Sequence, residues 1–213
     1  MKKYYIILIS CFWMFSCNEV KKQENQKDER SDHQLGIEHV SHPDLLHWLQ
    51  YYQTTIDSSF SIDNFVFELE TEIPKTEGSV LALFDDSFDK IYTDFLIYSP
   101  NQKKYIDIDS YQWSLDTNTN APMFEADQEI TLVDLESEKA WRIGFLGPSY
   151  VVENALWQND SIVLLLQNSY DQVPSIQKVN VNTFSKSTYN YNDTLAKKSD
   201  YRIIRINKIL NNE

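Results

Sequence analysis

The amino-acid sequence predicts a mainly β protein, with an antiparallel meander or sandwich-like sheet and one amphipathic helix near the N-terminus. From residue 129 onward, apolar or alternating segments recur about every ten residues between turn-forming residues, which is typical of antiparallel strands. One segment that starts near residue 43 has its apolar residues at helical spacing. Aromatic residues make up 14% of the chain, which supplies large side chains for a single core.

The first sixteen residues have the layout of a secretory leader. Lys2 and Lys3 precede an apolar run from Tyr4 to Phe15, which is shorter than the roughly 20 apolar residues of a membrane-spanning helix. The residues Met14-Phe15-Ser16-Cys17 that follow resemble the lipobox of bacterial lipoproteins. This resemblance implies that Cys17 is lipidated, becomes the mature N-terminus and anchors the chain to a membrane.

A second cysteine competes with Cys17 for this role. The residues Leu8-Ile9-Ser10-Cys11 also resemble a lipobox, and letter by letter they match the consensus better. Cleavage there would leave the apolar residues 12–15 on the mature chain. We prefer Cys17, because the composition changes from apolar to polar at that point. A plain signal peptide or an interfacial anchor is the remaining alternative.

Residues 18–36 are expected to form a polar tether. They mix charges of both signs and show no hydrophobic periodicity, which is typical of a disordered linker. The chain is therefore expected to hold a signal peptide (1–16), a lipidated cysteine with its tether (17–36) and one acidic β-rich domain (37–213). No cysteine follows Cys17, so no disulfide is expected in that domain.

The charge of the chain restricts its partners. The sequence has 19 basic and 32 acidic residues, a formal net charge of −13, and loss of Lys2 and Lys3 with the leader takes −13 to −15. Such a surface disfavours nucleic acid, because binding there depends on cations that neutralise phosphates. It equally disfavours docking of the domain on anionic lipid. A protein partner with a basic surface is expected, with the membrane contacted through the lipid on Cys17.

The expected helix begins near Ser41. Ser41 suits the N-cap, Pro43 fits the first turn, and Asp44 complements the positive end of a helix. The apolar residues that follow at helical spacing are Leu45, Leu46, Trp48, Leu49 and Tyr52.

From residue 60 the hydrophobic period changes to two. Residues 65–70 alternate in the manner of a half-buried strand. A hairpin is expected between residues 94–98 and 104–108, because Pro100 fits the second position of the turn between them. Residues 114–127 are expected to form a loop.

Six more strands are expected, at 129–135, 140–146, 151–157, 161–167, 175–181 and 186–191. Residues 162–166 are apolar on both faces and should form the central, most buried strand. The stretch from Ala155 to Tyr191 resembles one blade of a β-propeller, but a single blade cannot close a propeller, which favours a sheet or sandwich. Tyr201 to Leu210 fits a helix or a strand, and we assign a strand because four of its residues are isoleucine.

Histidines are the first candidates for metal ligands. All four lie between His33 and His47, and His39, His42 and His47 with the nearby Asp44 form the candidate set. His42 and His47 are five residues apart, which is poor spacing for two ligands on one helix face. We therefore expect no metal and no cofactor, with these histidines as the only weak candidates. The domain after His47 contains no histidine, so it offers no base for a Ser-His-Asp site.

Acidic residues are the candidates for binding. Glu68, Glu70 and Glu72 are expected to share one strand face, where like charges raise each other's pKa and attract a cation. The alternative is a solvated strip that discourages edge-to-edge aggregation. Asp107 and Asp109 are expected to share another face. The sequence contains no Gly-x-Ser-x-Gly motif and no glycine-rich phosphate loop, so no catalytic residue is assigned.

The tripeptides Asp160-Ser161-Ile162 and Asp193-Thr194-Leu195 resemble acceptors for O-glycosylation in Bacteroidetes-type bacteria. Together with the leader, they resemble envelope lipoproteins of that group. The resemblance implies attachment to the cell envelope, at the outer membrane, with its periplasmic or surface side left open.

Three functions follow in order of preference. The first is a non-catalytic envelope lipoprotein that binds a protein partner, in the manner of an immunity or assembly-accessory protein. The second is a carbohydrate-binding or carbohydrate-processing surface lipoprotein, for which Trp113, Trp141 and Trp157 and the paired acids are the motivation. The third is a metal-binding lipoprotein that uses the histidines.

Overall fold

A computed structural model describes residues 42–119 and 121–211 of the 213-residue chain. These residues belong to one compact unit, Gln34–Glu213. The predictions for the leader, Cys11, Cys17, the tether and His39 concern residues outside the described part.

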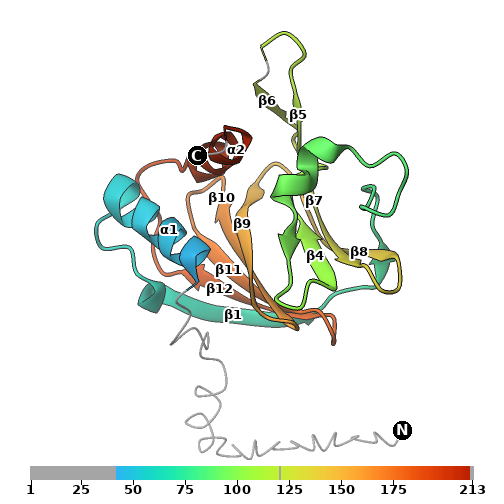
Figure 1. The fold of residues 1–213 in the computed structure, drawn as a ribbon. Coiled ribbons are helices and arrows are strands. Elements are labelled where there is room, and N and C mark those ends of the chain that lie inside the picture. Colours follow the sequence, from blue (N-terminus) through green and yellow to red (C-terminus); the bar gives the residue numbers. More distant parts are fainter. Residues whose placement is uncertain (1–41, 120, 212–213) are drawn as a thin grey trace, which may run out of the picture. The chain divides into compact units, whose positions relative to one another are not determined.

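The larger part of the fold is a five-stranded antiparallel sheet, which we call the first sheet (Figure 1). Four of its strands, β9 to β12, are consecutive in the chain and pair with their neighbours as a meander, which agrees with the pattern predicted for residues 155–191. The early strand β1 pairs with the last of them, β12. In spatial order they are β1 (Phe65–Glu72), β12 (Ser185–Tyr191), β11 (Ser175–Asn180), β10 (Ile162–Ser169) and β9 (Tyr150–Asn159).

The second sheet also has five antiparallel strands. Their order is β2 (Thr76–Glu77), β8 (Lys139–Leu146), β7 (Gln128–Asp134), β4 (Lys104–Asp107) and β3 (Ile97–Tyr98). The expected hairpin around Pro100 is confirmed, since Ile97 pairs with Ile106 and Tyr98 with Tyr105. Residues 114–127 are not wholly a loop, because β5 (Trp113–Leu115) and β6 (Pro122–Phe124) pair at its base and extend away from both sheets (Figure 1).

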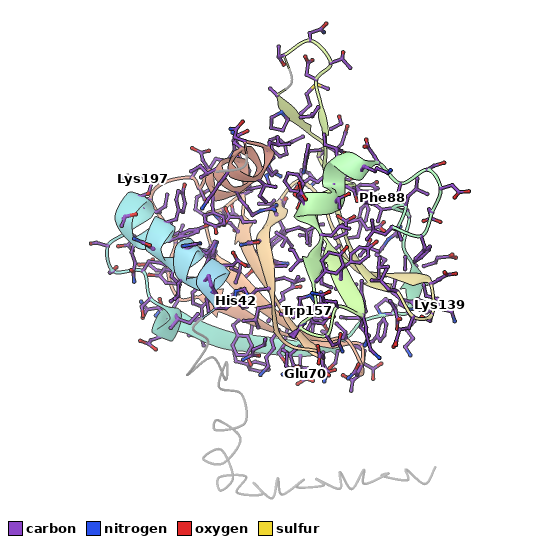
Figure 2. The ribbon with its side chains drawn as sticks, in the orientation of Figure 1. His42, Glu70, Phe88, Lys139, Trp157 and Lys197 are labelled. Carbon is purple, nitrogen blue, oxygen red and sulfur yellow. The ribbon has the colours of Figure 1, made fainter. Side chains whose placement is uncertain are left out.

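The main core lies between the two sheets. Ile106, Ile130 and Leu132 of the second sheet pack in one cluster with Val163 and Leu165 of the first. Figure 2 shows how side chains fill this space, with Trp157 at one end. The indole of Trp157 donates to the carbonyl of Ile97 at 2.8 Å and so links the sheets. The prediction of a mainly β, antiparallel, sandwich-like fold is confirmed.

Strand β10 is buried on both faces, as its apolar sequence predicted. Val163 and Leu165 face the second sheet, while Leu164 and Leu166 face the opposite way. It is second from the edge of its sheet rather than central. Both faces of β10 are buried because helices cover the outer face of the first sheet. A strand can therefore be apolar on both faces without being central in its sheet.

The outer face of the first sheet is covered by α1 (Pro43–Tyr51), which continues into a π-helical turn, Tyr52–Ile56. Leu45, Trp48 and Tyr52 of this segment are buried against the sheet, which confirms the predicted helix. Its N-cap is His42 and not Ser41, because the Asp44 backbone N–H donates to His42 Nδ1 at 3.3 Å. Pro43 then occupies the first helical position, which suits its fixed φ.

Helix α2 (Tyr201–Leu210) corrects the strand predicted for the same residues. Tyr201 and Ile206 are buried while Ile203 and Ile204 are exposed, which is a helical and not an alternating pattern. Ile206 packs against Tyr92, a contact that overrides the strand propensity of isoleucine. Neither helix, nor any other in the described residues, has the length and apolar character needed to cross a membrane.

Short helical turns complete the fold. Ile62–Asn64 and Lys90–Phe95 form 3-10 helices, the first of which leads into β1. Ala82, in the irregular segment before the second turn, packs with Leu96 and with Tyr105 and Val133 of the second sheet.

Candidate functional site: a pocket between two helices

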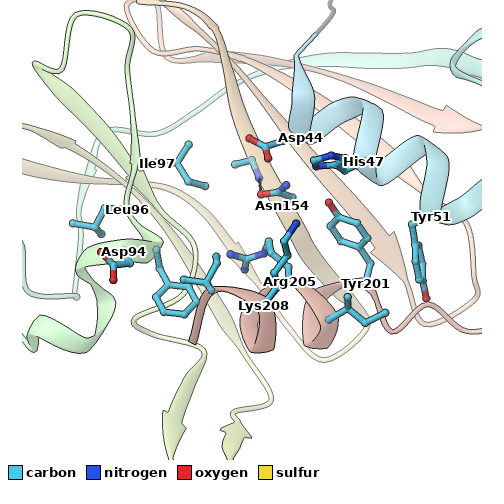
Figure 3. Close-up of a pocket in the computed structure, with 14 residues that line it drawn as sticks. Asp44, His47, Tyr51, Asp94, Leu96, Ile97, Asn154, Tyr201, Arg205 and Lys208 are labelled. Atoms are coloured by element: carbon cyan, nitrogen blue, oxygen red, sulfur yellow. Dashed lines mark hydrogen bonds between the residues drawn. The ribbon is translucent and has the colours of Figure 1, made fainter. Parts of the chain in front are cut away.

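A pocket of about 550 Å³ opens between α1, α2, β9 and the 3-10 helix Lys90–Phe95 (Figure 3). Its volume lies within the range of roughly 300–1,000 Å³ that is usual for small-ligand sites. The pocket combines segments from residue 44 to residue 209, so only the folded chain assembles it.

The walls of the pocket are largely apolar. Its apolar lining includes Phe95, Ile97, Ala155 on β9, and Ile204 and Ile209 on α2. Ile204 is 50% exposed, so a substantial apolar surface of α2 remains open beside the pocket.

Charged side chains stand around this apolar surface. Arg205 and Lys208 are three residues apart on α2 and therefore share a helix face. Asp44 and His47 are likewise three apart on α1, and Asp94 comes from the 3-10 helix. Among the described residues, Lys208 and Asp94 make no ion pair with each other or with any other side chain. The pocket thus has two unpaired charges of opposite sign.

Arg205 fixes α2 to the sheets. Its guanidinium donates to both carboxylate oxygens of Asp109, at 3.0 and 2.7 Å, and its Nε–H donates to the Glu153 carbonyl at 2.8 Å. Asp109 is fully buried and also accepts the indole N–H of Trp113 at 3.0 Å. This two-pronged geometry holds the arginine in one orientation.

Glu153 holds α1 and α2 to β9 from beneath the pocket. Its carboxylate accepts the indole N–H of Trp48 and the hydroxyl of Tyr52, both at 2.8 Å. It also accepts the Ser199 hydroxyl at 2.5 Å, just before α2. Burial raises the pKa of Glu153, and these three hydrogen bonds oppose that shift.

Two tyrosines complete the buried surroundings. Burial raises the pKa of Tyr201 to about 12, although its hydrogen bond with Asn154 acts in the opposite direction. Burial and the neighbouring Glu153 carboxylate also raise the pKa of Tyr52. Both phenols therefore stay neutral at physiological pH, where they act as hydrogen-bonding and packing groups.

The predicted acidic pair Asp107 and Asp109 does not face solvent. Asp107 is buried, accepts the backbone N–H groups of Asp109 and Ser110 at 2.9 and 3.0 Å, and also accepts the Ser110 hydroxyl. Burial raises the pKa of Asp107. Asp109 is occupied by Arg205. Both carboxylates therefore stabilise the fold at the end of β4, and neither is accessible to an external ligand.

The prediction that Glu68, Glu70 and Glu72 share a face is wrong for Glu68. A β-bulge lies between Phe67 and Leu69, and Glu68 accepts the side-chain N–H of Asn190 at 2.6 Å. Glu70 pairs with Ser187, which lies three residues from Asn190 and so on the other face of β12. All three glutamates are exposed, and Figure 2 shows Glu70 on β1.

The histidines within the described part do not converge. His42 caps α1 and His47 lines the pocket. No group of three histidine, cysteine or acidic side chains suited to a metal ion occurs within residues 42–119 and 121–211.

Sequence reasoning missed Glu153, Arg205 and Lys208. One signal for Glu153 was available, since Glu153 and Asn154 interrupt an otherwise apolar strand. A charge inside such a strand is retained mainly where it has partners. Arg202, Arg205 and Lys208 recur every third residue, which favours a helix with one basic face.

Comparison with known proteins adds no relative to this description. No protein-family model matches the chain, and no curated protein or solved structure was found to match it.

Proposed function

We propose that this chain is a lipid-anchored, non-catalytic binding protein of the bacterial cell envelope, and that its β domain binds a protein partner through the pocket between α1 and α2. The observation that carries the proposal is the pocket itself, an open apolar cavity bordered by unpaired charges. Apolar surface with a few oriented polar groups is the usual composition of a binding site.

The anchoring of the walls supports this proposal. Arg205 holds α2 on Asp109, and Glu153 bonds to Trp48 and Tyr52 of α1 and its continuation. A site whose walls are already ordered pays less conformational entropy when a ligand binds. The buried polar groups beneath the pocket therefore favour recognition of a partner.

The envelope location rests on the sequence. The lipobox-like residues that end at Cys17 imply a diacylated N-terminal cysteine. Mass spectrometry of the mature N-terminal peptide tests this: a lipid-modified peptide that begins at Cys17 is expected. A lipidated peptide that begins at Cys11, or a mature N-terminus without lipid, would contradict the assignment.

Several of the residues that motivated the carbohydrate and metal alternatives are engaged within the fold. Trp113 and Trp157 are buried in the core, and Asp107 and Asp109 are bonded to protein donors. His42 caps a helix. The described residues therefore favour the partner-binding proposal over these two.

Adjacent isoleucines of α2 provide a matched test. Ile204 lines the pocket, whereas Ile203, 38% exposed, does not. The full-length protein and its Ile204→Asp and Ile203→Asp variants are used to capture partners from envelope extract. The captured protein is then purified, and its Kd for each version is measured by calorimetry.

The expected result is a Kd raised about tenfold or more by Ile204→Asp, because a charge is placed in the apolar contact, and nearly unchanged by Ile203→Asp. Equal binding by all three versions would contradict the proposal. Circular dichroism and thermal unfolding of both variants show whether the fold is kept, since both substitutions are at exposed positions.

A further inference from the structure

Two basic side chains on α2 give the pocket a cationic side. Lys208 makes no ion pair within the described residues. Arg205 has five N–H donors, of which three are used on Glu153 and Asp109, so two N–H groups are left for another acceptor. Asp109 balances the charge of Arg205, which makes Lys208 the source of net positive charge.

A carboxylate is an anion that suits this pair. A lysine ammonium contributes charge, and a guanidinium with its orientation fixed contributes directed N–H groups. Lys208 also lies in the last turn of α2, where a cation interacts favourably with the helix dipole. The dipole accounts for a lysine at this position, but it gives no reason for the lysine to border an apolar pocket.

The apolar walls place a requirement on the rest of the ligand. Phe95, Ile97, Ile204 and Ile209 all line the pocket (Figure 3). An occupant must therefore carry apolar groups next to its anion.

Acidic residues at the opposite border favour a basic group further along the ligand. Asp94 has no ion pair in the described part of the chain, and the ion-pair partner of Asp44 there is the capping residue His42, at 3.5 Å. The whole chain carries a formal charge of −13, which attracts a basic partner.

From these observations we infer that the pocket binds the free C-terminus of a partner protein. The terminal carboxylate contacts Lys208 and Arg205, the last apolar side chains fill the space between Phe95 and Ile204, and an upstream lysine or arginine faces Asp94 or Asp44. This inference rests on the proposed function and specifies the chemistry of the partner.

Synthetic peptides test the carboxylate directly. The probe is a short peptide with one lysine followed by leucine and valine residues, made as the free acid and as the C-terminal amide. Binding to the full-length protein is measured by fluorescence polarisation. The free acid is expected to bind about tenfold more tightly, because the amide loses a charge-assisted contact.

Two lysines of the C-terminal region provide the matched variants. Lys208→Gln is expected to weaken binding of the free acid severalfold and to reduce the difference between acid and amide, of which Arg205 supplies the rest. Lys198→Gln removes an exposed lysine that does not line the pocket and should leave both affinities unchanged. Replacement of the peptide lysine by alanine should weaken binding to the wild type but not to the Asp94→Asn variant.

The outcomes separate this inference from the proposed function. Equal binding of acid and amide, with loss of both in Ile204→Asp, leaves pocket binding intact and overturns the C-terminus inference. The inference is equally overturned if no peptide binds while partner capture still depends on Ile204. If no peptide binds and capture is also insensitive to Ile204→Asp, both proposals are wrong.

Discussion

Two buried carboxylates of this fold, Asp109 and Glu129, each pair with an arginine but connect very different parts of the chain. Glu129 on β7 contacts Arg142 on the neighbouring strand β8, 13 residues away, at 2.8 Å. Asp109, just after β4, contacts Arg205 on α2, 96 residues away, at 2.7 Å. The first pair lies within one hairpin, and the second joins a helix to the sheets.

The surroundings of the two pairs also differ. Glu129 accepts three further hydrogen bonds, from the backbone and hydroxyl of Ser79 and from Thr131, and the Arg142 side chain is 33% exposed. Asp109 has one other side-chain donor, Trp113, and the Arg205 side chain is only 10% exposed. Glu129 therefore has several hydrogen-bond donors besides Arg142. Asp109 depends mainly on Arg205, which also lines the candidate site.

The largest expected effect comes from removal of each arginine. Arg205→Met should lower the free energy of unfolding by about 3–5 kcal/mol, because it leaves a buried carboxylate without its counter-charge. Arg142→Met should cost about 1–2 kcal/mol, because Glu129 keeps its three other donors and the lost arginine is itself partly exposed. Urea unfolding followed by tryptophan fluorescence measures both.

An equal loss of unfolding free energy in the two arginine variants would contradict the proposed difference between the Asp109 and Glu129 pairs. The double variant Asp109→Leu with Arg205→Met serves as control. It should recover part of the stability lost in Arg205→Met, because the unpaired charge is gone.

Replacement of Glu153 should have the next largest effect. Glu153→Ala leaves the buried Trp48 and Tyr52 donors without an acceptor and should cost about 3 kcal/mol. Glu153→Gln keeps a carbonyl oxygen as acceptor and should cost less than half as much. Thermal unfolding of both variants checks this, and a loss as large in Glu153→Gln would show that the negative charge itself is required.

The pH dependence of stability should have opposite signs at the two glutamates. Burial favours a higher pKa for Glu129, but the bonds from Ser79 and Thr131 and the charge of Arg142 hold it below its usual value. Its stabilising contribution is therefore present above the usual glutamate pKa and is lost as the pH falls through the lowered pKa. Glu153 has a raised pKa, so its contribution is present at low pH and is lost as the pH rises through that value.

Thermal unfolding from acidic to neutral pH tests these signs. Glu129→Gln should be less stable than the wild type at neutral pH, and the gap should close in acid. Glu153→Gln should show the opposite trend, and its stability relative to the wild type should increase as the pH rises. Parallel stability curves for the two variants would contradict the opposite pKa shifts.

The smallest expected effect concerns the cap of α1. His42→Ala should destabilise the protein by about 0.5–1 kcal/mol, while His42→Asp should stabilise it by a few tenths, because aspartate is a better N-cap. Differences in Tm between the two variants measure this. An effect as large as that of Glu153→Ala would mean that the local cap, and not the buried anchor, determines whether α1 stays attached.

The sequence predictions were correct where an element depends on neighbouring residues and wrong where it depends on residues distant in the chain. The helix at Pro43 and the hairpin at Pro100 were predicted correctly, because the signals lie within a few residues of the element that they specify. The strand assigned to α2 was wrong, because the burial of Ile206 depends on Tyr92, Phe95 and Trp113 far away in the chain. The prediction that three glutamates share a strand face was wrong because of a β-bulge, which can be seen only in the pairing of β1 with β12.

The sequence by itself determined the mainly β class, the position of α1 and the acidic charge of the chain, because periodicity, capping and composition are local properties. Only the tertiary structure decided that Asp109 is a buried partner of Arg205, that Glu153 serves both helices and that Lys208 borders an apolar pocket. These outcomes depend on which distant residues meet after folding and on how far each charge is removed from water. The candidate site belongs to this second class, since its walls come from four separate segments that meet only when the two helices pack on the sheets.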